Sequence, residues 1–542
     1  MEESEKERKA KRPRRETTSP AALINDDVLH CILSRLSAFP FASAACVSKT
    51  WNRVCNRILS RPKLASAISL NPSPLAALRE VVDKVLSQPI RPHFAIANIG
   101  PGMKLKQTLN FIVDRLGSNT PIVVSSVSGV IGRDAVTDEF KEIKWRGDLS
   151  DDDDEGVYAH SGIVLTVGYV PGIKVDAIPL CKPKKAPRPE MIDKFVMDIR
   201  NYTASVSGRT SPIGIIMFGV GDFDQKPVIE KLDYAMPMKT IIVGDERCPF
   251  LYKSGNNSRN IIGSLRCSID AVALVFANDR DKAHGIGDIR FHVALSDGVL
   301  AIGQSYKAAS VRVNDSEGST WLTARRERQK DVLDGQQLLD DVNAELENHV
   351  QIFEELDQSE LYIGVTKRRN YSVGSEKARL KTSLVFHEVI RGDEEYLYVD
   401  DVGIRSGDTF QFYLADSRAA KTSCNNVSMA FGNLKLDWET KNCSGRDVDN
   451  AINKEEPFGG FIFSCCGRGK PFFDHRNVDS SPFLENFPDM PLAGTFCSGE
   501  IARGHSSSIR LGSQEKSSVH CCLHVYSTVY LVMSYTPALE EY

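Results

Sequence analysis

The sequence predicts a mixed α+β protein that begins with a small all-α segment. Within residues 24–59, apolar residues recur at three- and four-residue spacing, as they do on one face of a helix. Beyond residue 90, short runs of β-branched residues alternate with helical patterns between glycine and proline turns, which is typical of sheets covered by helices. No leucine-rich period recurs at a fixed spacing, so we do not expect a solenoid.

The composition indicates a globular chain with room for about three domains. Of its 542 residues, 42% are hydrophobic and 25% are charged, and the net charge of −4 gives no general basicity for binding nucleic acid. No apolar run approaches the roughly 18 residues that a membrane span needs. The amino terminus lacks the apolar core of a secretory signal. The thirteen cysteines are therefore interpreted as reduced intracellular thiols.

Residues 24–59 form two helical runs on either side of Phe39-Pro40. Asn25 is a suitable N-cap for the first run, and acidic residues follow it where the helix dipole favours negative charge. We expect the Phe-Pro pair to end this helix, because proline disfavours helical geometry in the residue before it. The second run has apolar residues at Ala44, Val47, Trp51, Val54, Cys55 and Ile58. Two such short helices are too small to be stable alone, so we expect them to pack on another surface.

This stretch resembles the F-box, the helical module that docks substrate receptors onto the Skp-type adaptor of cullin–RING (SCF) ubiquitin ligases. Ile24-Asn25 stands where the family usually has Leu-Pro, and Val47-Ser48-Lys49-Thr50-Trp51 matches its Val-x-x-x-Trp pattern. The resemblance implies a Skp-type adaptor, and cullin through it, as partners. It also implies a set of adaptor-binding side chains, namely Ile24, Val28, Leu29, Ile32, Leu33, Leu36, Val47 and Trp51. The alternative is an ordinary amphipathic hairpin that belongs to the following domain.

The remainder of the chain is interpreted as alternating helices and strands. Helices are expected at residues 75–86, 105–116, 191–202, 227–233 and 329–356. Strands are expected at residues 93–99, 121–130, 162–168, 213–218, 240–243, 271–277, 289–294, 361–366, 383–390, 396–399 and 409–414, with a last pair of strand-like runs at 519–535. Asp297-Gly298 is a hairpin signal, whereas residues 437–456 are polar and are predicted to form an exposed insertion.

Residues from about 75 to 535 resemble FIST domains, a family named after F-box and intracellular signal transduction proteins. The first half matches through residues 123–132 and through Leu295-Ser296-Asp297-Gly298-Val299. The second half matches through Phe463-Ser464-Cys465 with Gly467-Arg468-Gly469, and through Gly494-x-Phe496 with Gly499-Glu500-Ile501. These features divide the chain into a basic tail at residues 1–18, an F-box-like module at 19–66, an N-terminal FIST domain at 75–318 and a C-terminal FIST domain at 319–542.

The glycine-flanked blocks contain three candidate ligand-binding residues. Arg468 can present its guanidinium to a carboxylate or phosphate, and Glu500 can receive an ammonium group. Together they would suit an amino-acid-like ligand, which is the class that bacterial FIST proteins are thought to sense. The alternative is that the glycines permit tight turns and Arg468 pairs with Glu500. Cys465 lies in the same blocks, either as a reactive thiolate favoured by Arg468 or as an inert buried thiol.

The remaining motifs predict no metal and no cofactor. His520, Cys522 and His524 would share one face of a strand, but a closed zinc site needs a fourth ligand that nothing in the sequence marks. The acidic run at residues 149–155 lacks the EF-hand spacing, so a flexible loop is expected there. No nucleophile elbow, HExxH motif or Walker loop is present. We therefore do not expect an enzyme.

The sequence predicts the substrate-recognition subunit of an SCF ubiquitin ligase, which recruits an unidentified protein for ubiquitination and degradation. The alternative is an intracellular sensor of a small amino-acid-like ligand through the FIST region. A thiol-dependent enzyme centred on Cys465 ranks behind both. Basic residues cluster around Pro13 and form either a nuclear import signal or a solvated tail. We expect the protein in the nucleus, the cytoplasm or both.

Overall fold

The computed structural model describes residues 25–145, 161–183, 188–221, 224–260, 267–314, 316–348, 360–440, 454–503, 519–520 and 522–538. The predicted basic tail and the acidic run at residues 149–155 lie outside these ranges. The chain divides into two units. The smaller comprises Met1–Leu59 with Leu86–Ile90, and the larger comprises Ser60–Val85 with Arg91–Tyr542.

The smaller unit contains three short helices, α1 (Asp26–Leu33), α2 (Ala38–Ala45) and α3 (Lys49–Ile58). Asn25 caps α1 as predicted, because its side chain accepts a hydrogen bond from the Asp27 N–H at 3.3 Å. The predicted break at Phe39-Pro40 is wrong, since Pro40 lies in the first turn of α2. A proline there loses no hydrogen bond, because the first-turn N–H groups have no partner within the helix. The core of this unit comprises Leu29, Leu33, Phe41, Ala44, Val54 and Cys55.

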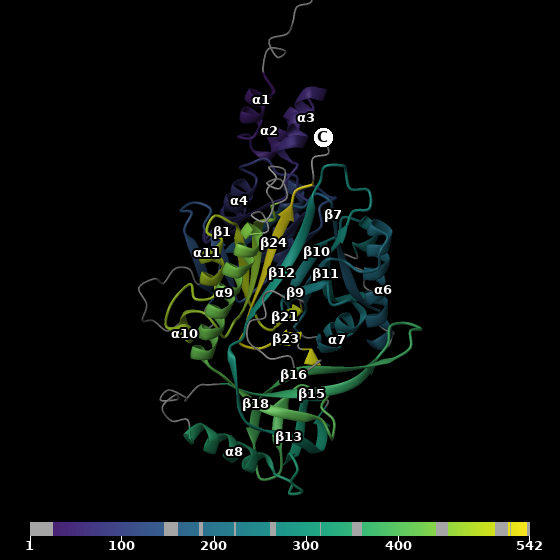
Figure 1. Cartoon of the computed structure of the whole chain (residues 1–542), viewed down its shortest axis with the longest axis vertical. Helices are drawn as coiled ribbons and strands as arrows, with labels where there is room; N and C mark the ends of the chain where they lie inside the picture. The colour runs from purple at the N-terminus through teal and green to yellow at the C-terminus, as the bar shows by residue number, and fades with distance from the viewer. Residues whose placement is uncertain are drawn as a thin grey trace, which may run out of the picture. The chain divides into compact units, whose positions relative to one another are not determined.

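The first sheet of the larger unit has five strands in the order β1-β6-β2-β3-β10. Its two edge strands, β1 and β10, are labelled in Figure 1. Their bounds are β1 Lys63–Ser69, β6 Ile163–Tyr169, β2 Phe94–Ile99, β3 Ile122–Ser126 and β10 Phe250–Lys253. The helices α4 (Pro74–Val85) and α5 (Leu105–Leu116) pack against this sheet. Strands β2 and β3 are parallel and α5 connects them, as the alternation of strand and helix predicted.

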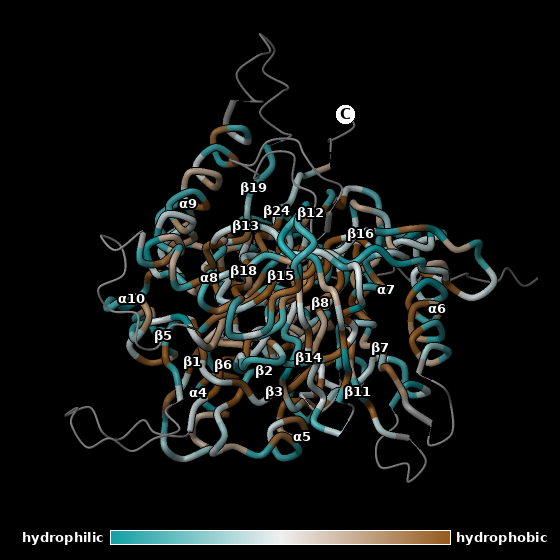
Figure 2. Tube along the Cα trace, turned by 90° about the horizontal axis from the view of Figure 1, so that it is seen from below, coloured by the Kyte–Doolittle hydropathy of each residue, from teal (hydrophilic) through white to brown (hydrophobic). Residues whose placement is uncertain are grey.

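The second sheet has six strands in the order β23-β21-β9-β8-β11-β7. Their bounds are β23 Leu523–His524, β21 Glu500–Arg503, β9 Ile241–Asp245, β8 Gly214–Gly219, β11 Cys267–Asn278 and β7 Ile173–Pro183. The helices α6 (Arg188–Ser207) and α7 (Lys226–Ala235) share a hydrophobic core with it. In Figure 2, α6 carries alternating hydrophobic and hydrophilic segments, as expected of a helix with one buried face.

The third sheet has six strands in the order β12-β24-β19-β20-β4-β5. Their bounds are β12 Asp288–Ser296, β24 Thr528–Thr536, β19 Glu456–Cys465, β20 Leu492–Cys497, β4 Gly129–Arg133 and β5 Phe140–Lys144. It packs against the long helix α9 (Ser417–Thr440) and the short helix α11 (Ser481–Asn486) through a core rich in phenylalanine. The short helix α10 (Lys470–Phe473) follows β19. Residues of all three sheets meet in the largest hydrophobic core of the molecule.

The remaining strands form a closed antiparallel barrel, which lies at the lower end of Figure 1 together with α8 (Gly335–Asn348). The ring runs β15-β18-β13-β14-β17-β16 and closes because β16 pairs again with β15. Its strands are β13 Val299–Asn314, β14 Ser319–Arg326, β15 Leu361–Tyr371, β16 Arg379–Gly392, β17 Leu397–Asp400 and β18 Thr409–Ala415. The short strand β22 (Val519–His520) extends β16 in parallel.

The two halves of the larger unit are interleaved. Strands from both sides of the expected boundary at residue 318 pair in three of the four sheets, for example β4 with β20 and β9 with β21. The boundary itself falls beside the β13–β14 hairpin, whose register joins Asn314 to Ser319. The predicted FIST halves therefore do not correspond to separate sheets.

Two further local predictions, both on strands, differ from the structure. The single strand expected at residues 121–130 is two strands, β3 and β4, in different sheets. The hairpin expected at Asp297-Gly298 is absent, because β12 pairs with β24 while β13 pairs with β14 and β18. Gly298 instead permits a close approach, since a Cβ at this position would lie 2.0 Å from the carbonyl oxygen of Tyr526.

Candidate functional site

A cleft of about 240 Å³ lies between the barrel and the strand ends of the second and third sheets. Strand β16 contributes Phe386, His387 and Glu388 to one wall, and residues at the end of β17 continue it. The opposite wall is built by the turns that follow β9, β19 and β20. Because these turns contain the glycine-flanked blocks, two of the three predicted ligand-binding residues, Cys465 and Glu500, line this cleft.

Glu500 is fully buried at the first position of β21. The backbone N–H and the hydroxyl of Ser527 donate hydrogen bonds to its Oε2 at 3.2 and 2.9 Å. Burial nevertheless dominates and raises the pKa of Glu500 to about 8. The preceding Gly499 has φ +116, and a Cβ there would lie 2.4 Å from Oε2 of Glu246. Glycine is therefore favoured at position 499, both by its positive φ and because a side chain there would collide with the carboxyl group of Glu246.

Arg468 does not line the cleft with Glu500. Its role is structural, as one of the two interpretations had it, but its partner is Asp479 and not Glu500. Its guanidinium is completely buried and pairs with Asp479, with Nε and Nη2 at 2.9 and 2.8 Å from Oδ1. Nη1 donates to the carbonyl oxygens of Ser296 and Tyr526 at 3.2 and 2.9 Å, and Nη2 donates to the Ser296 hydroxyl and to the Cys424 thiol. These bonds leave no pair of guanidinium N–H groups available to bind a ligand, so Arg468 stabilises the fold at this position.

The flanking glycines have separate structural reasons. A Cβ at Gly467 would lie 2.7 Å from the ring of Tyr526, whereas Gly469 adopts φ +89, in the left-handed region that favours glycine. In the motif Gly467-Arg468-Gly469, the first glycine lets the Tyr526 ring approach the backbone, the arginine forms a buried ion pair, and the second glycine permits the turn before α10.

The thiols near this motif differ in their chemistry. The hydrogen bond from the neighbouring Cys465 thiol, with help from Ser498 and the cation of Lys144, lowers the pKa of Cys466 to about 6 despite its burial. The same thiol–thiol hydrogen bond, together with burial, raises the pKa of Cys465 well above its usual range. Burial likewise raises the pKa of Cys497. Of the two alternatives left open for Cys465, the raised pKa favours the inert buried thiol. A thiolate is favoured at Cys466 instead, which also lines the cleft.

Sequence reasoning missed the acidic pair that follows β9. Asp245 and Glu246 are almost completely buried, and burial raises the pKa of each to about 7. Glu246 lines the cleft, with its Oε2 3.5 Å from Nε of Arg247. The signal was present in the sequence, because Asp-Glu follows a short β-branched strand directly, a position from which side chains enter a cleft at the end of a sheet.

The barrel wall adds further charge that the sequence did not place here. Glu360, Glu388 and Asp400 line the cleft, and burial together with the nearby Glu360 and Asp400 raises the pKa of Glu388. Lys226 from α7 contacts Asp401 and donates to the Phe386 carbonyl oxygen at 3.2 Å. The cleft is therefore predominantly acidic on this side.

The F-box-like unit presents an apolar surface of its own. Val28, Ile32, Phe39 and Val47 are 52%, 47%, 55% and 62% exposed. Leu29 and Leu33 are buried in the small core instead, and Leu36 and Trp51 pack against it while remaining partly buried. Ile24 lies outside the described residues. Of the predicted adaptor-binding side chains, Val28, Ile32 and Val47 are thus the most accessible.

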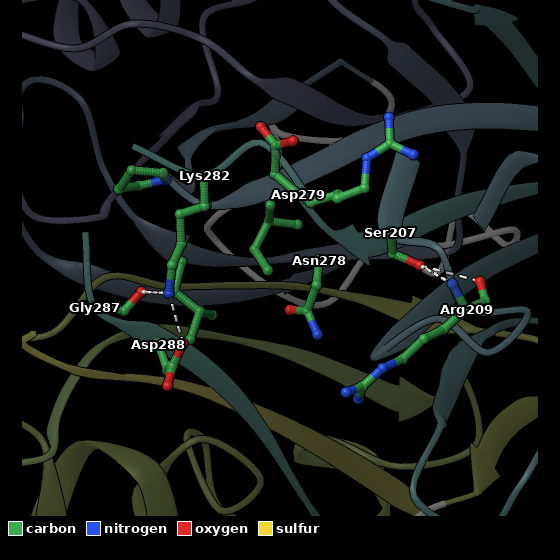
Figure 3. Close-up of a pocket in the computed structure, with 12 residues that line it drawn as sticks. Ser207, Arg209, Asn278, Asp279, Lys282, Gly287 and Asp288 are labelled. Carbon is green, nitrogen blue, oxygen red and sulfur yellow. Dashed lines mark hydrogen bonds and ion pairs between the residues drawn. The ribbon is translucent and has the colours of Figure 1, made fainter. Parts of the chain in front are cut away.

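A second pocket, of about 250 Å³, lies where α6, β7, β11 and β12 come together (Figure 3). Its charged groups are largely paired. Lys282 Nζ lies 2.8 Å from Asp288 Oδ1 and donates to the Gly287 carbonyl oxygen at 3.3 Å, and Asp279 pairs with Lys174 at 3.0 Å. We therefore place the candidate ligand site in the cleft that contains Glu500.

The cluster at His520, Cys522 and His524 is not one strand. His520 lies in β22, which pairs with β16, whereas His524 lies in β23, which pairs with β21 in another sheet. The prediction of a shared strand face is therefore wrong. Within the described ranges, the structure places no group of three or more histidine, cysteine or acidic side chains where it would hold a metal ion.

Comparisons with known proteins bear on both units. Residues 23–62 match the F-box domain, and residues 354–503 match the FIST C domain. A curated F-box/LRR-repeat protein from Arabidopsis thaliana is 45% identical over 522 residues, which cover 95% of this chain and 94% of the relative. The chain belongs to the F-box proteins. In this F-box protein, none of the helices that the structure describes combines the length and apolarity needed to cross a bilayer.

The FIST C match explains the position of the cleft in part. It includes β15 to β21, and thus both the Cys465 and the Glu500 blocks. Glu246 and Lys226 lie outside the match, in the first half of the chain. The cleft is therefore completed only because the two halves share sheets.

Proposed function

We propose that this F-box protein is the substrate-recognition subunit of an SCF ubiquitin ligase in the nucleus or cytoplasm. The single observation that carries the proposal is the apolar surface of Val28, Ile32, Phe39 and Val47 on a three-helix unit whose own core is small. Exposed apolar side chains on so small a unit favour burial against a partner. The F-box match supports a Skp-type adaptor as that partner.

The proposed mechanism is positional. The adaptor and cullin would hold the larger unit, with its bound target, near a ubiquitin-charged partner, so that proximity increases the rate of transfer. No residue of this chain is assigned a catalytic role. Fully burying an exposed Val, Ile or Phe side chain contributes about 1.5–3 kcal/mol. The four side chains are about half exposed, so their burial contributes roughly 3–6 kcal/mol in total. Other contacts must supply the rest of the roughly 12 kcal/mol of a nanomolar complex and its ordering costs.

Adaptor capture tests the proposal. Ile32→Asp places a charge on the exposed apolar surface and should reduce co-purification of the Skp-type adaptor from cell extract at least tenfold. The matched control is Asn56→Asp, which introduces the same charge at an exposed position of α3. Undiminished adaptor recovery with Ile32→Asp would contradict the proposal. Leu33 is unsuitable for this test, because it is fully buried and its replacement by a charged residue would unfold the unit.

A second candidate function is the sensing of a small ligand through the FIST region. The specific observation that favours it is a cleft lined by the buried carboxyl of Glu500 and the Cys466 thiol. With Arg468 engaged elsewhere, Arg247 is the accessible cation that would receive a ligand carboxylate. A ligand that binds only the native state raises the melting temperature. A flat thermal response of the full chain across a panel of amino acids would count against this function.

A further inference from the structure

The charges that line the cleft are unbalanced. Six carboxyl-bearing side chains line it, namely Glu246, Glu360, Glu388, Asp400, Asp401 and Glu500, against the two cations Lys226 and Arg247. Lys226 contacts Asp401, and Arg247 lies beside Glu246 and Asp401. Among the described residues, no ion pair engages Glu360, Glu388, Asp400 or Glu500. Burial raises the pKa of Glu500 to about 8, so it is largely protonated near pH 7. The remaining acidic side chains still outnumber the two cations, and such an excess of carboxylates in a partly enclosed space attracts cations.

A buried histidine independently indicates what kind of cation fits. His387 lines the cleft from β16 and is only 2% exposed. Its Nδ1 lies 3.0 Å from the carbonyl oxygen of Asp400. Because a carbonyl oxygen only accepts, Nδ1 carries the proton and Nε2 is an acceptor. Nε2 is buried and has no hydrogen-bond partner among the described residues. Leaving a buried acceptor without a hydrogen bond costs free energy, so a ligand with an N–H or O–H donor for Nε2 is favoured.

Aromatic rings complete the cleft. Tyr362, Phe386 and Tyr526 line it beside the carboxylates, and the rings of Tyr362 and Tyr526 meet edge to face with centroids 6.3 Å apart. Aromatic faces attract organic cations. A volume of about 240 Å³ is below the range of drug-sized ligands, which starts near 300 Å³, and it suits a single extended group.

We propose that this cleft binds an organic cation that carries N–H donors, namely the guanidinium or alkylammonium group of a basic side chain or of a small amine. The carboxylates supply the countercharge, and the free acceptor of His387 takes one N–H. A quaternary ammonium neutralises the carboxylates but has no N–H to donate to Nε2 of His387. It therefore binds more weakly than a guanidinium or a primary alkylammonium. The inference specifies the ligand class of the cleft on which the sensing function rests, and it is independent of adaptor binding.

Calorimetric titration of the full chain tests the ligand class. The probes are n-butylguanidinium, n-butylammonium and n-butyltrimethylammonium, which share one chain and one charge. The two N–H-bearing cations should bind at least tenfold more tightly than the trimethyl compound. Equal affinities for all three would overturn the role of His387, and the absence of binding by all three cations would overturn the site. Adaptor capture, measured on the same preparation, reports separately on the receptor function.

A peptide pair distinguishes the two sources of the cation. The peptides are identical except that one carries a central arginine and the other citrulline, which keeps the shape and loses the charge. Tight binding of the arginine peptide relative to both citrulline and free n-butylguanidinium assigns the cleft to a basic side chain of a protein. Binding of the free cation with equal or higher affinity assigns it to a small amine. Both results support the site. If the arginine peptide binds measurably and the citrulline peptide binds as tightly, the site is contradicted.

Variants locate the binding. Glu388→Gln removes one carboxylate at an exposed position of the cleft and should weaken n-butylguanidinium binding about threefold to tenfold. His387→Phe roughly keeps the volume of the ring and removes Nε2. It should therefore reduce the difference in binding affinity between n-butylguanidinium and n-butyltrimethylammonium. Glu395→Gln is the matched control, since Glu395 is exposed in the β16–β17 turn and does not line the cleft. Affinities unchanged by Glu388→Gln would overturn the assignment, even if His387→Phe failed to fold.

Discussion

Arg468 shows how a motif that suggests ligand binding from sequence is used for structure. A guanidinium between two glycines looks accessible, but burial and the carboxylate of Asp479 make it an internal ion pair. Burial alone would lower the pKa of Arg468, but Asp479 outweighs this effect and raises the pKa, which keeps the guanidinium charged. Asp479 lies only 11 residues from Arg468. The other hydrogen-bond partners of the guanidinium, such as Ser296 and Tyr526, are far away in the sequence, so local reasoning did not reach its burial.

The Arg468–Asp479 pair makes a stability prediction. Arg468→Met should lower the free energy of unfolding by about 3–5 kcal/mol, because it leaves the carboxylate of Asp479 buried without a partner. Adding Asp479→Leu should recover part of that loss. Urea denaturation measures both, with Arg325→Met, at an exposed strand position, as the control. A loss below about 1 kcal/mol for Arg468→Met would contradict the buried pair.

The thiols beside the cleft make a reactivity prediction. Because the pKa of Cys466 is lowered to about 6, it is largely thiolate at pH 7 and should react with iodoacetamide faster than Cys465 or Cys497. Peptide mass spectrometry after brief labelling of the folded chain measures the order. Faster labelling of Cys465 than of Cys466 would contradict the assignment of the thiolate to Cys466.

At the scale of elements, sequence periodicity predicted most helices and strands but not their pairing. The N-cap at Asn25 and the strands β2, β3 and β6 of the first sheet follow from local patterns, whereas the edge strands β1 and β10 were missed. The 24-residue helix α9 was missed, although Val427, Phe431, Leu434 and Trp438 form a helical stripe that packs in the phenylalanine-rich core. The pairing of β4 with β20 joins segments more than 350 residues apart, and no local pattern encodes it.

Gly298 makes a prediction at the junction of β12 and β13. Gly298→Ala forces a methyl group toward the Tyr526 carbonyl oxygen, which lies 2.0 Å from the position of the added Cβ. The resulting shift should cost about 1–3 kcal/mol of stability. Gly221→Ala is the control, because the nearest heavy atom to its added Cβ is 3.9 Å away. Thermal unfolding measures the melting temperatures of the two variants. Equal melting temperatures would contradict the predicted steric clash at the β12–β13 junction.

At the scale of the whole molecule, interleaving of the two halves explains why the candidate site was only partly predictable. Glu500 and Cys465 were found because glycines mark their blocks. Glu246 and His387 come from elements whose approach depends on the barrel and the second sheet being built from both halves. Their arrival in one cleft is a consequence of tertiary structure.

The buried carboxyl groups beside the cleft predict a pH dependence of stability. Burial raises the pKa of Asp245 and Glu246 to about 7 and that of Glu500 to about 8, whereas in the unfolded chain they titrate near 4. The folded state therefore holds more protons between these values, and their contribution to stability falls as the pH rises from about 4 to about 8. Glu500→Gln should reduce the loss of stability between pH 6 and pH 8, measured by urea denaturation. Identical losses in variant and wild type would contradict the raised pKa.

The binding affinity between the purified full chain and a purified Skp-type adaptor tests the receptor function most directly. The exposed surface of Val28, Ile32, Phe39 and Val47 predicts a stable one-to-one complex that Ile32→Asp weakens at least tenfold and Asn56→Asp leaves unchanged. Equal affinities for the wild type and Ile32→Asp, or no complex with the wild-type chain, would contradict it.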